Sequence, residues 1–461
     1  MGQRSDRSGD APSGGTRIPI RVVALTALVG LAGAAAWGTS RLLSRAEQTA
    51  ELATEVPDLP PTVELPGAVG AALLTADRSL RDALSGDLEA AGDAAGRLGQ
   101  LYQANNFLDR AARSYELAIG RDATAPRWPH LLASVHRSRG DSRAEIELLE
   151  RAVDLAPGYA PAWLRLADAR FTEGLVEPAR DAYEQRLALV DGDAYAHLGL
   201  ARIALDAEAW EAAEEHLVEA GTADGFDTVY RLLATVHAQL GRAAQREAAL
   251  ARADRGRPFA PAPDPWVDDL MDQSYDVASL LLRVSRWSEA GRTVLAQRAF
   301  ERARQLEPEN PEIYVLLGRY APDVAQARQA FETAVSLAPD HAVAHVGLGE
   351  MLLRENRPAE AEVVLRRAVE LDPEQAAGHK NLGLAAAAAG RFEEAIRHVR
   401  RSMTLSPNTV SFHYSLASIL REAGRSVEAR DELRLLLERW PSHPGATQAL
   451  AALDREGETD R

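Results

Sequence analysis

The feature that most constrains the fold of this chain is a pattern that returns every 34 residues near its C-terminal end. Four independent columns keep this step: Pro373, Pro407 and Pro441; Ala361, Ala395 and Ala429; Leu348–Gly349, Leu382–Gly383 and Leu416–Ala417; and Asn356, Gly390 and Gly424. A period of this length is typical of arrays in which each unit packs only against its neighbours. A chain of 461 residues can therefore fold without one large central core.

The pattern of each 34-residue unit predicts two amphipathic helices joined by a tight turn. The small residue after each leucine lies midway along the first helix, where it lets the second helix approach. A Gly or Asn then supplies the turn, as in the stretches RENRPAEA and AAGRFEEA. Alanines and a large apolar residue at i, i+4 and i+7 give the second helix one apolar face. Proline closes the unit because it cannot continue a helix.

This pattern resembles the tetratricopeptide repeat, and the resemblance covers most of residues 92–443. It implies an all-α fold, a right-handed α-solenoid of helix-turn-helix repeats. About ten units are predicted: five in residues 92–258 and five in residues 276–443, followed by a capping helix and tail in residues 444–461. The fourth unit, read from Leu198–Gly199, would carry two extra residues in its turn, and the seventh would lack three. The second and fifth units lack the first alanine of the second helix, which is replaced by Glu145 and Arg246.

The N-terminal part contains VVALTALVGLAGAAAWGTS, 19 uncharged residues between Arg21 and Arg41. As a helix this run is about 28 Å long, close to the thickness of the hydrocarbon core of a bilayer. We expect residues 18–40 to form a transmembrane signal-anchor behind a disordered cytoplasmic tail, residues 1–17. Residues 41–91 would then form a juxtamembrane helix, a Pro-rich spacer and an N-terminal cap.

The excess of arginine before the apolar run favours an N-terminus inside the cell. This predicts a single-pass protein of the inner membrane whose body is extracytoplasmic. A signal peptide that is cleaved, leaving a secreted protein, is the main alternative. A buried core helix is another.

Residues 259–275 interrupt the repeats with FAPAPDPWVDDLMDQSY, a segment rich in proline and aspartate. One interpretation is a linker followed by a capping helix, with Asp264 as its N-cap. A second is a segment whose Trp266, Met271 and Tyr275 dock into a groove of this molecule or of another. A third is a calcium site, although the spacing is not that of an EF-hand. Its ligands would be Asp264, Asp268, Asp269, Asp272 and Asp276.

Composition excludes several classes of function. The chain has no cysteine, which excludes disulfides, thiolate metal sites, cysteine nucleophiles and covalently attached haem. A formal net charge of −16 without a basic stripe argues against nucleic acid as a partner. No serine stands in a nucleophile-elbow context. We therefore expect no enzymatic activity, no cofactor, no metal and no small-molecule substrate.

Three histidines, His345, His379 and His413, occupy one column of the repeat. His341 and His345 are four residues apart and could share a helix face as metal ligands. The tetratricopeptide pattern often has tryptophan in this column. We therefore interpret the three histidines as packing residues rather than ligands.

The resemblance also implies that the first helices of successive units line a concave groove that binds an extended or helical peptide. Carried over by position, the residues expected to face it are Arg165, Asp168, Arg231, Lys380, Asn381, Tyr414, Ser418 and Arg421. Lys380–Asn381 resembles part of the clamp by which chaperone-binding members hold a C-terminal carboxylate. Val346–Gly347 stands where a matching basic position would be, so a groove rich in alanine with few polar anchors is the alternative.

Together these observations predict a non-enzymatic, membrane-anchored scaffold that binds other proteins or peptides through the groove, on the extracytoplasmic side of a bacterial membrane. The alternative is an assembly or maturation factor for a membrane or exported complex. Residues 264–266 are similar to DPW segments of bacterial membrane-anchored tetratricopeptide proteins that accompany multihaem cytochromes. This likeness extends the alternative to a cytochrome-containing complex.

Overall fold

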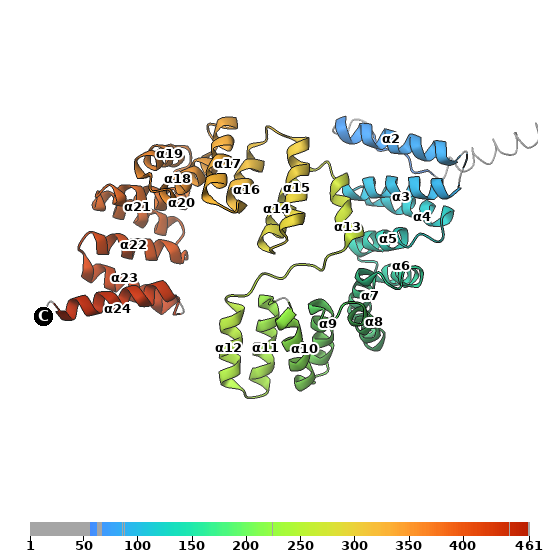
Figure 1. Ribbon diagram of the computed structural model, residues 1–461, viewed down its shortest axis with the longest axis horizontal. Coiled ribbons are helices and arrows are strands. Elements are labelled where there is room, and N and C mark those ends of the chain that lie inside the picture. The colour runs from blue at the N-terminus through green and yellow to red at the C-terminus, as the bar shows by residue number, and fades with distance from the viewer. Residues whose placement is uncertain are drawn as a thin grey trace, which may run out of the picture. The chain divides into compact units, whose positions relative to one another are not determined.

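The computed structural model describes residues 56–61, 67–84, 86, 88–223, 225–441 and 443–459. This part of the chain is helical, apart from one isolated bridge between Phe226 and Arg257. Its elements are α2 (Gly67–Leu84), α3 (Leu88–Ala104), α4 (Leu108–Arg121), α5 (Arg127–Arg139), α6 (Ser142–Leu155), α7 (Ala160–Thr172), α8 (Val176–Leu189), α9 (Ala194–Asp206), α10 (Trp210–Ala223), α11 (Asp227–Gln239), α12 (Ala243–Ala253), α13 (Pro265–Asp268), the 3-10 helix η2 (Asp269–Gln273), α14 (Val277–Glu289), α15 (Thr293–Leu306), α16 (Pro311–Tyr320), α17 (Val324–Leu337), α18 (Ala342–Arg354), α19 (Pro358–Leu371), α20 (Ala376–Ala388), α21 (Phe392–Leu405), α22 (Val410–Glu422), α23 (Ser426–Arg439) and α24 (Pro444–Thr459) (Figure 1). The expectation of an all-α fold is confirmed for these residues.

The described residues form two compact units. One contains the described residues up to Gln103 together with Phe107–Val135. The other contains Ala104–Asn106 and the described residues from His136 onward. The second unit runs without a break through the Pro/Asp-rich segment 259–275, and both candidate binding surfaces lie within it.

Helices pair in the way that the 34-residue period predicts. In the pair α18–α19, Leu365 of the second helix lies so close to Gly349 of the first that an added Cβ would come within 2.4 Å of it. First helices also contact the first helices of neighbouring pairs, as α7 does with α9, and as α16, α18, α20 and α22 do in turn. Successive first helices therefore share one surface.

The turns inside the pairs adopt the left-handed backbone conformation at regular intervals. Positive φ angles recur every 34 residues in two series: Asn106 (65°), Gly140 (74°), Gly174 (74°) and Glu208 (54°), and then Asn356 (59°), Gly390 (75°) and Gly424 (77°). Glycine adopts this conformation without cost and asparagine tolerates it, whereas other residues pay a penalty. The backbone of the turn is therefore strained at Glu208.

The position of Glu208 also corrects the reading of the fourth unit. The turn between α9 and α10 has the same length as the turn between α7 and α8. Leu200–Ala201, rather than Leu198–Gly199, thus occupies the repeated column, and the prediction of two extra turn residues was wrong. Gly199 instead faces the ring of Tyr183, which a Cβ would approach to 2.2 Å.

The three residues missing from the seventh unit come from its first helix rather than from its turn. α16 has 10 residues, whereas α18 has 13. The chain leaves α16 through Ala321, which is extended (φ −62°, ψ 143°), and Asp323 then caps α17 by accepting a hydrogen bond from the backbone N–H of Gln326. The end of the first helix is therefore absent from this pair.

A shared hydrogen bond accounts for the histidine column. In His345, His379 and His413 the ring Nε2 lies 3.0, 3.0 and 3.3 Å from the carbonyl oxygen of the proline that closes the preceding unit. Trp163 and Tyr314 donate to the equivalent proline carbonyl, at 2.9 and 2.8 Å. In these five units the column thus links the first helix to the end of the unit before it. No group of three or more potential metal ligands gathers in the part of the chain that the structure describes.

α24 packs against α23 after the last pair and buries Ala446 and Leu453. It occupies the place expected of a capping helix. The apolar run of residues 22–40 lies outside the described residues. Among the helices that are described, none combines the length and the apolar character needed to cross a bilayer.

Candidate peptide-binding sites

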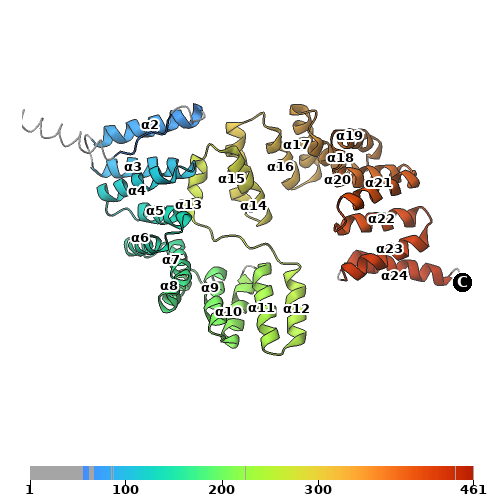
Figure 2. The ribbon, with the colours of Figure 1, turned by 180° about the vertical axis from the view of Figure 1, so that it is seen from behind.

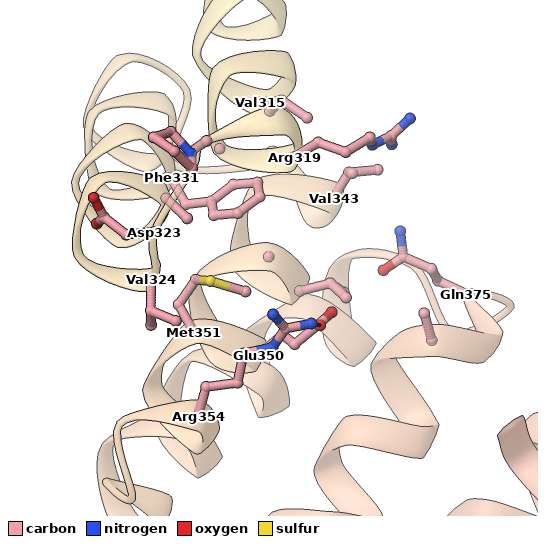
Figure 3. A pocket seen from close by; sticks show the side chains of 17 residues that line it. Val315, Arg319, Asp323, Val324, Phe331, Val343, Glu350, Met351, Arg354 and Gln375 are labelled. Carbon is pink, nitrogen blue, oxygen red and sulfur yellow. Dashed lines mark hydrogen bonds and ion pairs between the residues drawn. The ribbon is translucent and has the colours of Figure 1, made fainter. Parts of the chain in front are cut away.

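A pocket of about 510 Å³ opens between α16, α17, α18 and the start of α20 (Figure 3). Its apolar lining comprises Val315, Gly318, Ala321, Pro322, Val324, Ala327, Phe331, Val343, Val346, Gly347, Met351 and Ala377. Its polar lining comprises Arg319, Asp323, Glu350, Arg354 and Gln375. A volume of this size with a mainly apolar wall and few polar groups is typical of a ligand site.

The pocket lies where the short helix α16 ends. Arg319, near the end of α16, and the residues of the shortened connection, Ala321–Asp323, lie on its rim. In a pair of ordinary length, such as α18–α19, the first helix continues for three more residues. The pocket therefore coincides with the gap in the repeat.

Two glycines shape the floor of the pocket around Phe331. A Cβ at Gly318 would come within 2.7 Å of the Phe331 ring, and a Cβ at Gly347 within 2.3 Å. The first helices α16 and α18 therefore both pack against the ring of Phe331 on the second helix α17. Phe331 is 6% exposed. Gly347, which stands one repeat before Asn381, therefore has a packing role.

Charged side chains of both signs line the pocket. Arg354 pairs with Glu350 at 2.7 Å, and Figure 3 shows the two side chains together at the edge of the pocket. Arg319 is exposed. Lys380, near the pocket on α20, is partly buried, and this burial lowers its pKa although Glu350 opposes the shift. Arg354 is thus already paired with a carboxylate, and Arg319 and Lys380 are two further cations at or near the pocket.

Asn381 lies beside Lys380 at 1% exposure, and neither its amide nitrogen nor its amide oxygen has a hydrogen-bond partner among the described residues. A buried amide without partners is costly. The structure thus gives no polar contact that would fix Asn381 in its place.

A second surface lies on α7 and is covered by the chain itself. The indole of Trp266 stacks on the ring of Tyr159, with centroids 3.6 Å apart and planes 15° apart. The hydroxyl of Tyr159 donates to Asp264 at 2.7 Å and accepts from the backbone N–H of Trp266 at 3.2 Å. The other carboxylate oxygen of Asp264 lies 2.7 Å from Nε of Arg165. Both oxygens of this aspartate are thus paired with the repeats.

The charged groups of this surface are largely removed from water. The side chains of Arg165 and Asp264 are 17% and 6% exposed. Burial, assisted by the negative charge of Asp264, raises the pKa of Tyr159 well above its usual range. Burial also raises the pKa of Asp168 on the same helix, although the hydroxyl of Tyr183 donates to its carboxylate at 2.7 Å.

The remaining predicted groove residues do not gather at either site. Arg231 is exposed and lies 3.8 Å from Asp227 of its own helix. Tyr414, Ser418 and Arg421 lie against the cap α24 around a space of about 20 Å³, which is too small for a peptide side chain. Tyr275 receives the guanidinium of Arg302 over its ring at 4.6 Å.

The aspartates of the interruption have separate partners rather than one shared cation site. Asp264 precedes α13 but does not cap it with its side chain, because its carboxylate is held by α7. Asp269 and Asp272 pair with Arg298 of α15 at 3.4 and 2.7 Å. Asp276 caps α14 by accepting from the backbone N–H of Ala278. The calcium interpretation was therefore wrong.

The α16–α20 pocket was not predicted, although the sequence contains a signal for it. The absence of three residues from the seventh unit was recognised in the sequence, but it was not interpreted as the position of a pocket. Tyr159 was also missed, because it precedes the first helix of the third unit, outside the positions taken to face the groove.

Comparisons with known proteins agree with this architecture. Models of the tetratricopeptide repeat match residues 97–160, 130–194, 321–382 and 380–444. Similar solved structures include yeast Tom70 (16% identity, covering 80% of this chain and 96% of that chain, TM-score 0.35). They also include PilF of Pseudomonas aeruginosa (19%, 41% and 86%, TM-score 0.35) and MamA of Desulfovibrio magneticus RS-1 (23%, 37% and 98%, TM-score 0.32). TM-scores this low carry no argument about function. No curated protein matches the chain.

Proposed function

This chain is a tetratricopeptide-repeat protein, and we propose that it is a non-enzymatic scaffold that binds a segment of another protein in the pocket between α16 and α20. Proteins of this family typically serve as scaffolds for protein–protein interaction. The observation that carries the proposal is the truncated α16, which opens an apolar pocket on the surface that successive first helices share.

The lining indicates what such a segment would contain. Val343, Val346 and Met351 offer an apolar wall to a large aliphatic or aromatic side chain. Arg319, Arg354 and Lys380 stand around it and are balanced nearby by Glu350 and by Asp323, which caps α17. A segment with one large apolar residue followed by a carboxylate fits this combination.

Site-specific photo-crosslinking tests the proposal. A photoreactive residue in place of Val343, which lines the pocket and is 38% exposed, should form adducts with a partner in native membranes. The same residue in place of Val363 on α19, which is 70% exposed and absent from the pocket, is the matched control. Ala377→Trp should fill the pocket and suppress the Val343 adduct.

The outcome that contradicts the proposal is an adduct pattern that is the same at both positions, or a Val343 adduct that survives Ala377→Trp. A partner that stays bound through purification supports a scaffold. A partner that leaves once its complex matures would instead indicate the assembly-factor alternative.

We place the scaffold on the extracytoplasmic face of the inner membrane, held by residues 18–40. The support is the apolar run and the arginines that precede it. A periplasm-active reporter fused after Arg461 should be active, and a cytoplasm-active reporter at the same position should be silent. The reverse pattern rejects this location without affecting the pocket.

A further inference from the structure

The segment Pro258–Trp266 lies on the repeats as a bound peptide would. After α12 the chain runs back toward α7 as an extended connection, which Figures 1 and 2 both show. It begins beside α11, where the carbonyl of Arg257 accepts from the backbone N–H of Asp227 at 2.9 Å. Phe259 then packs edge-on against Phe226 and Tyr195, with centroids 5.3 and 6.0 Å away. The segment thus passes α11 and α9 before it reaches α7.

Between Ala260 and Asp264 the segment buries alternate residues. Ala260 and Asp264 are 4% and 5% exposed and Ala262 is partly buried, whereas the two prolines between them, at positions 261 and 263, are exposed. This alternation is the period of an extended chain read from one side. Proline also limits the freedom of the undocked segment, so docking costs less entropy.

We propose that the surface formed by Tyr159, Arg165, Tyr195 and Phe226 is a recognition site for peptides in which an extended stretch leads into Asp-Pro-Trp at the start of a helical turn, as residues 258–264 lead into α13 here. Pro258–Trp266 occupies this site in cis, and a partner chain with the same motif replaces it. The site is separate from the α16–α20 pocket, and the inference does not depend on a ligand there.

Charge complementarity supports a carboxylate-containing ligand. Arg137, Arg165 and Arg202 lie close enough to influence the two carboxylates of this region, Glu145 and Asp168. Without Asp264 this region contains three arginines and two carboxylates. The carboxylate of Asp264 supplies the third negative charge. A peptide without an acidic residue would leave Arg165 buried and unpaired, which is unfavourable.

The segment can leave the repeats while η2 and α14 stay folded. Before Asp264 the segment buries Ala260 and part of Ala262, and Phe259 remains 47% exposed where it packs, so departure of the segment exposes little further apolar surface of its own. The next stretch has its own partners: Arg298 pairs with Asp272, and Met271 is fully buried in the core of α14–α15. Docking and undocking therefore concern the part that ends near Trp266.

The test uses a fluorescent peptide with the sequence of residues 257–269 and measures its binding to the full-length chain by anisotropy. Asp264→Ala combined with Trp266→Ala removes both anchors from the cis segment and leaves Tyr159 and Arg165 in place. This double variant should bind the peptide about ten-fold or more tightly than the wild type does, because the cis segment no longer competes. A peptide that carries the same two substitutions should not bind.

Added to the double variant, Arg165→Met should abolish binding, whereas Arg231→Gln, on the exposed face of α11, should leave it unchanged. Equal affinity of wild type and double variant, or no binding by a double variant with wild-type circular dichroism, overturns the proposal. Arg165→Met in the otherwise wild-type chain gives an independent measurement. It should release the segment and accelerate chymotrypsin cleavage at Phe259, and an unchanged rate overturns the proposal as well.

Discussion

The ring of Trp266 lies flat on the ring of Tyr159, 107 positions earlier in the chain, with 3.6 Å between their centroids. A residue in a proline-rich interruption thus contacts the N-terminal edge of a helix from a repeat completed long before it. The same tyrosine hydroxyl joins the backbone of Trp266 to the carboxylate of Asp264. The aromatic stacking and the hydrogen bonds of Tyr159 therefore hold the same part of the segment, residues 264–266.

Loss of this stacking should free the segment locally. Trp266 is half-buried, so we expect Trp266→Ala to weaken docking by about 2 kcal/mol, less than for a fully buried tryptophan. The measurement is the rate of chymotrypsin cleavage after Phe259, which is 47% exposed and remains in both proteins. The rate should rise at least about ten-fold, since 1.4 kcal/mol corresponds to a factor of ten when cleavage follows the open population. An unchanged rate would show that other contacts hold the segment.

Glu208→Gly should stabilise the chain. Glu208 has φ 54° at a turn where the two preceding repeats carry glycine at 74°. A left-handed conformation costs a non-glycine residue about 1–2 kcal/mol, and the greater flexibility of unfolded glycine offsets part of this gain. The expected net gain is about 0.5–1 kcal/mol, measured by urea unfolding. Gly174→Glu, the matched reverse change one repeat earlier, should lose a similar amount, and a loss of stability in Glu208→Gly would reject the strained turn.

Glu145→Ala should stabilise the chain at neutral pH. The side chain stands where the neighbouring repeats have the alanines Ala111, Ala179 and Ala213, and it is 5% exposed. Burial raises the pKa of Glu145, so its charged form is disfavoured in the folded protein. We expect a gain of about 1 kcal/mol at pH 7.

The sign of the pH dependence follows from the raised pKa. Folded protein binds the proton more tightly than unfolded protein, so the penalty is present above the folded pKa and is relieved as the pH falls through it. The advantage of Glu145→Ala should therefore shrink as the pH falls into the range in which Glu145 is protonated. An advantage that grows with acidity would contradict this assignment.

Two histidine pairs should destabilise the chain in acid. Nδ1 of His379 lies 3.2 Å from Nδ1 of His398, and His197 and His216 repeat this geometry at the same distance. Burial, followed by the neighbouring histidine, lowers the pKa of both His216 and His398. A depressed histidine pKa means that stability is full above the unfolded value, about 6.5, and is lost as the pH falls below it.

The double variant His216→Gln, His398→Gln should accordingly show a smaller fall in melting temperature between about pH 7 and pH 5 than the wild type. NMR titration of the two rings gives a second readout. If the variant and the wild type lose stability in parallel, the pairs do not contribute to acid sensitivity.

Deletion of Ala376–Thr409 should leave a folded, shorter array. It removes α20 and α21 and joins the end of one pair to the start of α22, so that first and second helices still alternate. Deletion of the 17 residues 376–392 instead removes α20 and the start of α21, which places two second helices in sequence. Circular dichroism should show native helicity only for the longer deletion, and equal damage would reject the repeat register.

Periodicity predicted most of the fold, because each unit repeats the same local chemistry. The glycine and asparagine turns and the closing prolines follow from backbone geometry alone, and the structure places them as expected. The fourth unit was misread because Leu198–Gly199 imitates the repeated column two residues too early. Only the position of Glu208, an unexpected residue for a left-handed turn, resolves it.

The sites were harder to predict because they depend on contacts between distant residues. Arg165 was expected to face a groove, but nothing local indicates that its partner is Asp264 of the same chain. Lys380 and Asn381 were chosen by analogy with a clamp, whereas the opening beside them arises from a missing stretch of α16. The missing stretch of α16 leaves no side chain in the sequence to examine. The opening beside it is therefore seen only once the neighbouring helices are placed in space.

The three residues absent from α16 amount to slightly less than one helical turn, which contains about 3.6 residues. Because the loss is nearly a whole turn, α17 can leave α16 in its usual direction. The later repeats can then keep their usual orientation along the array. A helix shortened by nearly one turn thus accompanies the pocket while the alternation of first and second helices is kept. A three-residue insertion after Tyr320, which restores a 34-residue seventh unit, should therefore close the pocket and prevent binding of its ligand.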